Sequence, residues 1–285
     1  MNKTRRKVEI AVISDVHLGT YGCHARELNR YLKSIHPETL ILNGDIIDIW
    51  QFSKRYWPNP HMKVIKQILN LSAKGTKVYY VTGNHDETLR KFAGLSMGNF
   101  HIVNKLELEL DGKKAWIFHG DVFDVIMQYS RWLAKLGAIS YDALILLNIF
   151  INKTSSLFGR GKVSLSKKIK DNVKSAVKYI NNFEETAAQL AIQKGFDYII
   201  CGHIHHPDDR IVKDNHGKTI RYLNSGDWIE NLTALEYKKG KWKIYRYLDD
   251  NKLLTNNGGV DEDFSSPADL DNKELFNQML KEFQN

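Results

Sequence analysis

Seven side chains of the types that bind divalent metal ions fall in five short blocks of this sequence. In chain order they are Asp15, His17, Asp45, Asn84, His119, His203 and His205. The set mixes carboxylates, an amide and imidazoles without a thiolate, which suits Mn, Fe or Zn better than Ca, an ion that takes only oxygen ligands. Two such ions held about 3.5–4 Å apart can polarise a phosphoryl oxygen and activate water. We therefore predict two divalent ions, with manganese favoured and iron or zinc as alternatives, acting on phosphate esters.

Each block follows a short apolar run that is typical of a buried strand. The runs are 8–14, 39–43, 78–82, 115–118 and 198–201, with glycine near most of their exits. In open α/β sheets, ligands bind beyond the carboxyl ends of the strands, where segments distant in sequence can meet. We expect the five blocks to converge at one edge of a sheet. Asp45, which is alone in its block, is the natural carboxylate to bridge the two ions.

The order of these blocks resembles the pattern of the calcineurin-like metallophosphoesterases, D-x-H, G-D, G-N-H-[DE], H and G-H-x-H. The matching segments are 15–17, 44–45, 83–86, 119 and 202–205, and the resemblance covers about residues 8–206. It implies an α/β fold, a four-layer α/β/β/α sandwich. It further implies one metal ion held by Asp15, His17, Asp45 and His205 and another held by Asp45, Asn84, His119 and His203.

The same resemblance assigns a catalytic role to the block that contains Asn84. It implies that His85 is an imidazole that does not bind metal and that stabilises the phosphate or protonates the leaving group. It also implies that Asp86 orients the His85 ring. A single Asp or His after a strand is more often a cap or turn residue, but five blocks in family order favour the catalytic interpretation.

Further features are similar to the branch of this family that contains UDP-2,3-diacylglucosamine diphosphatase. They are segments 14–19 and 119–121, the tryptophan-bearing segment 44–50, a helical insert and segment 202–207. This resemblance implies hydrolysis of a nucleotide pyrophosphate to a lipid monophosphate and UMP in lipid A biosynthesis. Well-known members of the branch carry Asn-Arg-Asp where this chain has Asn84-His85-Asp86. An arginine there would hold phosphate by a fork that histidine cannot reproduce.

Residues 122–195 contain almost no strand pattern bounded by glycine and predict a helical cap inserted in the catalytic domain. The expected helices are 122–136, 139–151, 164–180 and 182–195. Segment 143–151 is apolar nearly all round but far shorter than the ~20 residues that span a bilayer. Segment 160–178 is strongly basic. Together they fit either peripheral contact with an anionic membrane or a helix packed on the core with a solvated lysine face.

The loop 51–61, which comes just after the bridging Asp45, should overhang the metal ions. Lys54 and Arg55 could hold a second phosphate of the substrate. Trp50, Tyr56 or Trp57 could flank a base or a sugar. Aromatic residues at these positions could equally anchor a long loop by packing, and the sequence leaves both interpretations open.

The segments after the last histidines are expected to complete the fold. Segment 224–228 should support the metal-site loops, and segment 233–247 should form a hairpin that completes the second sheet. From residue 251 the chain turns polar, with a short helix expected near 269–283. Asp121 and Asp124 could be partners of His119 or carboxylates at a helix N-terminus.

Composition agrees with one intracellular catalytic domain. The chain has 285 residues with 42% hydrophobic content, and no repeat divides it, so we expect a catalytic domain over 1–250 and a polar tail over 251–285. Its 41 basic and 33 acidic residues favour an anionic partner, although we expect no nucleic acid. Two cysteines and no apolar leader predict the cytoplasm, with a peripheral position on the inner face of the cytoplasmic membrane as an extension of that prediction.

Two alternative functions stay open at this point. The first is a soluble phosphodiesterase or phosphatase acting on nucleotides or other phosphoesters, in which the cap has no membrane role. The second is an interaction scaffold without catalysis on the same fold. Degenerate scaffolds usually lose residues such as His85 or His119, and this chain has both.

Overall fold

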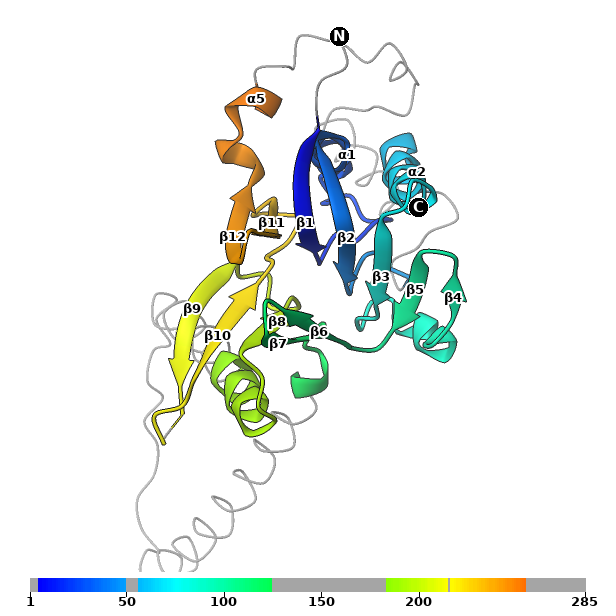
Figure 1. Cartoon of the computed structure of the whole chain (residues 1–285). Coiled ribbons are helices and arrows are strands. Elements are labelled where there is room, and N and C mark those ends of the chain that lie inside the picture. The colour runs from blue at the N-terminus through cyan, green and yellow to red at the C-terminus, as the bar shows by residue number, and fades with distance from the viewer. Residues whose placement is uncertain (1–4, 50–55, 125–182, 215, 255–285) are drawn as a thin grey trace, which may run out of the picture.

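Two β-sheets form the centre of the computed structural model, which describes residues 5–49, 56–124, 183–214 and 216–254 (Figure 1). The larger sheet has the strand order β12 (Lys241–Arg246), β11 (Thr233–Lys238), β1 (Arg6–Ile13), β2 (Ile35–Asn43), β3 (Lys77–Val81), β5 (Phe100–Val103) and β4 (Ser96–Met97). The smaller sheet has the order β6 (Leu106–Leu110), β7 (Lys113–Ile117), β8 (Tyr198–Cys201), β10 (Thr219–Asn224) and β9 (Asp208–Lys213).

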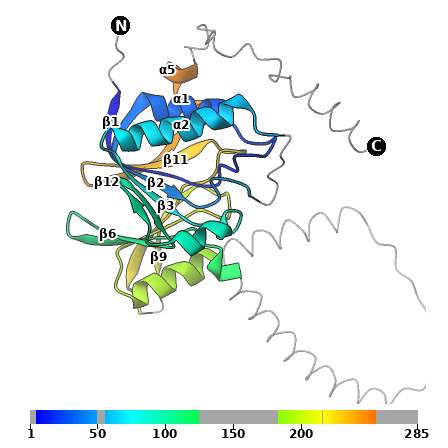
Figure 2. The same cartoon turned by 90° about the vertical axis from the view of Figure 1, so that its right-hand side faces the viewer.

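Helices cover the outer faces of the two sheets. Helices α1 (Ala25–Ser34) and α2 (Asn59–Ala73) pack on the larger sheet, and the helical segment 183–193 packs on the smaller one. Figure 2 shows α1 and α2 on one side of the sheets and the segment 183–193, in lime green, on the other. This arrangement confirms the predicted four-layer α/β/β/α sandwich.

Between the sheets lies a third apolar cluster that holds them together. It includes Val12 and Ile41 from the larger sheet and Ile117 and Ile200 from the smaller one. Successive residues of a strand point to opposite faces, so a strand buried on both sides must be apolar at nearly every position. The last four residues of β1 are all buried, which explains why the sequence shows a continuous apolar run there.

The strand ends bring the five blocks toward one side of the molecule. Strands β1, β2 and β3 run parallel, with Ile13 paired to Leu42 and Asn43 paired to Val81, so their carboxyl ends align. Strands β7 and β8 are parallel as well. Each block follows its predicted strand. The blocks do not all lie at one sheet edge, however, because three leave the larger sheet and two leave the smaller sheet.

The predicted C-terminal hairpin forms, but it belongs to a different sheet from the one expected. Strands β11 and β12 pair antiparallel across a turn in which Lys239 and Gly240 have φ of 51° and 74°, the positive values of a tight hairpin turn. The hairpin joins the larger sheet beside β1, with Ile10 opposite Tyr237. The prediction that it completes the second sheet is wrong, because β11 covers the edge of β1 that β2 leaves free.

Several expectations fall largely outside the described residues. The short segments 122–124 and 183–193 of the predicted cap are helical, and the rest of the cap lies outside. The helix expected near 269–283 also lies outside, so the division into a domain over 1–250 and a tail over 251–285 stays a prediction. The described chain ends after η2 (Tyr247–Asp249) and the short α5 (Asn251–Leu254). None of the helices in the described ranges is long and apolar enough to cross a membrane.

A buried histidine in α2 makes the stability of the fold depend on pH. His61 is only 3% exposed, and its Nδ1 accepts a hydrogen bond of 2.9 Å from the backbone N–H of Gly19. Burial lowers the pKa of His61 to about 4. An unfolded histidine has a pKa of about 6.5, so the unfolded chain binds more protons than the folded chain between these values. The contribution of neutral His61 to the free energy of unfolding is therefore complete above the pKa of the unfolded state. It is lost as the pH falls toward the pKa of the folded state.

The free energy of unfolding should fall between pH 7 and pH 5, and we expect this fall to be about 1–2 kcal/mol smaller in His61→Asn than in the wild type. The asparagine oxygen can accept the Gly19 N–H at either pH, whereas a protonated histidine Nδ1 cannot. Denaturant unfolding followed by circular dichroism at both pH values measures the difference. Identical pH dependence in the wild type and the variant would show that His61 does not cause it.

Candidate metal centre

Unusual backbone conformations mark the residues at the centre of the blocks. Asp15, His17, Asp45, His203 and His205 have φ of 52°, 52°, 54°, 68° and 54°. Residues other than glycine seldom adopt positive φ, and each such residue costs roughly 1–3 kcal/mol. The fold thus accepts local strain at the ends of β1, β2 and β8 in order to place these five side chains.

One cluster forms where β1 and β8 end. The potential ligand atoms of Asp15, His17 and His205 lie within 4.8 Å of one another. Asp15 is completely buried, and His205 Nε2 lies 3.2 Å from Asp15 Oδ1. On the other side of its ring, His17 places Nδ1 3.4 Å from Asp48 Oδ2, which leaves Nε2 on the side of the cluster.

A second cluster comprises Asp45, His119 and His203 at the ends of β2, β7 and β8. His119 Nδ1 lies 2.9 Å from the carbonyl oxygen of Asn43, so Nδ1 carries the proton of that hydrogen bond. His119 Nε2 then lies 3.1 Å from Asp45 Oδ2. His203 Nε2 lies 2.9 Å from Asp124 Oδ2, which leaves its Nδ1 for a metal ion.

At the centre, His17 Nε2 and Asn84 Oδ1 are buried without hydrogen-bond partners, and His119 Nε2 has the Asp45 carboxylate beside it at 3.1 Å. An unsatisfied buried polar group costs about 1–3 kcal/mol, and such groups are uncommon in folded proteins. All three atoms can donate a lone pair to a divalent cation. Together with the two buried aspartates they form the mixed oxygen and nitrogen set that suits Mn, Fe or Zn, so the residues fit a metal pair.

Asp45 belongs to the second cluster, and its charge also acts on Asp15 and His17 of the first. Its Oδ2 lies near His119, and its Oδ1 accepts a 2.8 Å hydrogen bond from the backbone N–H of His85. Burial favours the neutral form of this carboxyl group, but the hydrogen bond and charge of His119, the His85 N–H and the charge of His17 outweigh it and lower the pKa of Asp45. This position suits a carboxylate shared by two ions.

The negative charge of the centre also acts on His119. Burial alone would lower the pKa of this imidazole, but the nearby carboxylates, Asp45 first and then Asp15 and Asp121, raise the pKa to about 10. Protons and divalent cations compete for the same nitrogen atoms, so metal binding should release protons and weaken in acid.

Close packing explains two glycines of the blocks. A Cβ atom at Gly83 would lie 2.3 Å from Asp45 Oδ1 and 2.9 Å from His119 Cδ2. At Gly44, which has φ of 82°, a Cβ atom would lie 2.3 Å from His119 Nδ1. No side chain can occupy either position without displacing a candidate ligand.

His85 lies at the centre, but the expected partner of its ring is wrong. Its ring meets the His17 ring at 4.6 Å and 84°, and its Nδ1 lies 3.0 Å from Asp48 Oδ2. Asp86 instead accepts hydrogen bonds from the Tyr80 hydroxyl and from the backbone N–H groups of Gly83 and Ile46. Asp86 therefore holds the loop in shape. Asp48 is the carboxylate that orients His85.

Asp48 is the functional residue that sequence reasoning missed. It is 1% exposed and lies beside both His17 and His85. The signal that could have found it is the spacing Asp45-x-x-Asp48, which places a second carboxylate three residues after the first in the loop that follows β2.

The two aspartates after His119 have partners other than His119. Asp124 pairs with His203, as described above, and Asp121 forms an ion pair with Arg90 in η1 (Glu87–Phe92). Of the two roles left open for them, a partner of His119 and a carboxylate at a helix N-terminus, the second fits Asp121, which directly precedes the helical residues 122–124. The charge of Asp121 also raises the pKa of His119.

The segment 224–228 supports the loops as predicted. Asn224 Nδ2 donates to the carbonyl oxygen of Gly202 at 2.9 Å, and the hydroxyl groups of Ser225 and Ser14 lie 2.7 Å apart. The backbone N–H of Trp228 donates to the carbonyl oxygen of Asp15. These bonds tie the β10 exit to the exits of β1 and β8.

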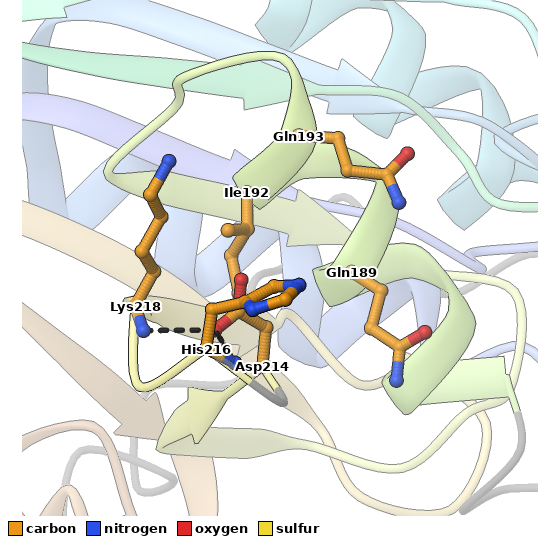
Figure 3. A pocket seen from close by; sticks show the side chains of 6 residues that line it. All are labelled: Gln189, Ile192, Gln193, Asp214, His216 and Lys218. Atoms are coloured by element: carbon orange, nitrogen blue, oxygen red, sulfur yellow. Dashed lines mark hydrogen bonds between the residues drawn. The ribbon is translucent and has the colours of Figure 1, made fainter.

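Trp50, Lys54 and Arg55 lie outside the described residues. A pocket of about 310 Å³ lies between the segment 183–193 and the loop that joins β9 to β10 (Figure 3). It is lined by Gln189, Ile192, Gln193, Asp214, His216 and Lys218, none of which is a candidate ligand.

Comparisons with known proteins match most of the chain. Residues 8–207 match the family model described as calcineurin-like phosphoesterase. The UDP-2,3-diacylglucosamine hydrolase of Aliivibrio fischeri (strain MJ11) is 26% identical over 246 residues, which cover 83% of this chain and 98% of that protein. The protein of the same name from Porphyromonas gingivalis is 30% identical over 252 residues, which cover 78% and 90%. The solved structure of an archaeal phosphodiesterase has a TM-score of 0.40 and 15% identity, and covers 83% of this chain and 98% of that one.

Proposed function

The chain belongs to the calcineurin-like phosphoesterase family, and on that basis we propose that it hydrolyses the pyrophosphate bond of UDP-2,3-diacylglucosamine, giving a lipid monophosphate and UMP. The observation that carries the proposal is the pair of largely buried His/Asp clusters at the ends of the four strands β1, β2, β7 and β8. The relatives named for this substrate align with most of the chain, which supports the choice of substrate.

We propose a division of the candidate ligands between two divalent ions. One ion would be held by Asp15, His17, Asp45 and His205, and the other by Asp45, Asn84, His119 and His203. Manganese suits this set of oxygen and nitrogen donors, with iron and zinc as alternatives. When bound, the pair supplies Lewis acid polarisation of the phosphoryl group and an activated water.

The protein's own contribution beyond the ligands is a fixed imidazole. Asp48 lies against His85 Nδ1, which leaves Nε2 to donate a hydrogen bond to a phosphoryl oxygen or a proton to the leaving group. The His85 side chain is 25% exposed, so a substrate can reach it. The single N–H of His85 makes fewer hydrogen bonds to phosphate than the arginine found at this position in well-known members of the branch. We propose that Lys54 and Arg55 hold the second phosphate, with Trp50 beside the nucleoside.

The test is Mn²⁺-dependent hydrolysis of UDP-2,3-diacylglucosamine by the purified full chain, with bis-p-nitrophenyl phosphate assayed in parallel. We expect release of UMP and a lipid monophosphate, and loss of both reactions when the metal is chelated. Turnover of the generic diester alone would overturn the lipid substrate and leave the soluble phosphodiesterase function. Absence of both reactions in the metal-loaded protein would contradict the proposal that the chain is a phosphoester hydrolase.

We further propose that the protein works in the cytoplasm and touches the inner face of the cytoplasmic membrane. The chain has a formal net charge of +8, which favours an anionic surface. Among the described residues, Phe92, Leu95 and Met97 are 45%, 45% and 56% exposed. The surrounding segment 88–106 contains no acidic residue, and Lys91 directly precedes Phe92, while Arg90 is already paired with Asp121. Apolar side chains beside cations suit an interface with anionic lipid.

Replacing both Phe92 and Met97 with serine should weaken binding to vesicles that contain anionic lipid about 5- to 20-fold, because each side chain loses its transfer into the interface. Cosedimentation with phosphatidylglycerol vesicles measures the change. A matched control replaces Met62 and Leu69 with serine, since these residues of α2 are 51% and 54% exposed on another surface. Equal effects of the two double variants would argue against a specific membrane surface here.

A further inference from the structure

Two tyrosine rings pack against each other, and one of them, Tyr21, follows His17 of the first cluster by four residues. The ring centroids of Tyr21 and Tyr56 lie 3.9 Å apart, with an angle of 35° between the ring planes. Tyr56 also meets the His61 ring edge-on at 5.9 Å and is partly buried. Tyr21, in contrast, is 44% exposed. The stack therefore has one ring anchored in the protein and one ring open to solvent.

A tight turn after His17 fixes the position of the exposed ring. The backbone N–H and the hydroxyl group of Thr20 both donate to the carbonyl oxygen of His17, at 3.1 and 2.9 Å. The N–H of Gly19 is held by His61, as described above. Because the turn closes on the carbonyl oxygen of His17, Tyr21 directly follows a turn that begins at a candidate metal ligand, and that ligand belongs to the same cluster as His205.

An exposed aromatic ring in this position is suited to a planar ligand. Aromatic side chains that stack on a nucleobase contribute about 1–3 kcal/mol per base. A nucleotide whose phosphate lies at the metal ions carries its base only one ribose away. Burial first, and then the neighbouring Tyr21, raise the pKa of Tyr56 to about 12, so its hydroxyl group stays protonated and can donate a hydrogen bond to a carbonyl oxygen.

We propose that the Tyr21 and Tyr56 stack is the platform for the nucleobase of the substrate, with uracil lying on the open face of Tyr21. This inference rests on the proposed hydrolysis of a UDP-linked substrate and adds an orientation to it. The nucleoside end would lie beside His17 and His205. The sugar and lipid end would then lie beside Asn84 and His119, toward the segment 88–106 with its exposed apolar residues.

If the two tyrosines serve only to pack the loop, the loss of the Tyr21 ring should affect ligand binding differently than if they hold a nucleobase. If the stack only anchors the loop, loss of the Tyr21 ring should weaken every ligand of the centre equally. If the stack holds a base, the loss should affect only ligands that carry one. The comparison therefore needs two ligands that share the ribose and the phosphate and differ in the base.

UMP and ribose 5-phosphate meet this requirement. Both are titrated as inhibitors of Mn²⁺-dependent bis-p-nitrophenyl phosphate hydrolysis by the full chain, and the ratio of their inhibition constants is compared. In the wild type we expect UMP to bind about 5- to 150-fold more tightly, the range that stacking on one base provides. Tyr21→Ala should bring the ratio close to one, whereas Tyr21→Phe, which keeps the ring, should preserve it.

Tyr21→Leu provides a second variant that retains apolar bulk without an aromatic face, and it should also lose the preference for UMP. An unchanged ratio in Tyr21→Ala and Tyr21→Leu would overturn the platform, and so would equal weakening of both inhibitors. Failure of the proposed function can be told apart from failure of the platform, because hydrolysis of UDP-2,3-diacylglucosamine by the wild type is measured separately.

Discussion

Asp45→Ala should remove metal binding and activity together. The Asp45 carboxylate is 2% exposed and belongs to the second cluster, with Oδ2 3.1 Å from His119 Nε2 and Oδ1 bonded to the His85 N–H. Its charge also acts on Asp15 and His17 of the first cluster. Removing it takes away the only side chain proposed to bind both ions and leaves His119 without its counter-charge. We expect turnover to fall at least about 1000-fold, which corresponds to about 4 kcal/mol of transition-state stabilisation.

Metal analysis of the dialysed variant and its rate with bis-p-nitrophenyl phosphate measure the two effects. Asp209→Asn is a suitable control, because Asp209 is a partly exposed carboxylate that pairs with Arg221 on the smaller sheet and lies outside the proposed centre. It should keep both metal and activity. Retention of two ions by Asp45→Ala would refute the bridging position.

His85→Ala should keep its metal ions and lose turnover. The His85 side chain contacts Asp48 and the edge of the His17 ring, and it is not among the proposed ligands. Loss of a positioned general acid or hydrogen-bond donor typically lowers the rate about 100- to 10,000-fold. We expect the fall to appear mainly in kcat, because the donor acts most strongly on the charge that develops in the transition state.

Metal content and steady-state kinetics of His85→Ala separate the two roles. Asp48→Asn refines the result, since Asp48 lies beside both His85 and His17. That variant should lower turnover and also weaken metal binding through His17 about 10- to 100-fold, the usual effect of removing the partner of a ligating histidine. Equal loss of metal in His85→Ala and Asp45→Ala would contradict the division of roles.

The sequence could predict that the candidate ligands gather in clusters, because the signals for this are local. Each ligand block directly follows a short apolar strand, and the parallel strands of each sheet carry their blocks to the same end. The sandwich follows from the same runs, since strands buried on both faces need cover on both sides.

The errors concern contacts between segments that are distant in sequence. Asp86 is adjacent to His85 in the chain, but its carboxylate is occupied by Tyr80, Gly83 and Ile46, so Asp48 takes the role expected for Asp86. The alternating pattern of β11 identifies a strand and a hairpin, yet it cannot tell which sheet has a free edge. The positive φ of Asp15 and His17 likewise depends on the assembled centre, because neither residue type favours that conformation strongly enough to reveal it.

Counting the metal ions at which activity saturates tests the dinuclear centre most directly. Protein stripped with a chelator is titrated with Mn²⁺, and bound metal and bis-p-nitrophenyl phosphate hydrolysis are followed together. We predict that activity appears with metal and saturates at two ions per chain in the wild type, while Asp45→Ala binds neither ion tightly. Full activity in the stripped protein, or saturation at a single ion per chain, would contradict a dinuclear phosphoesterase.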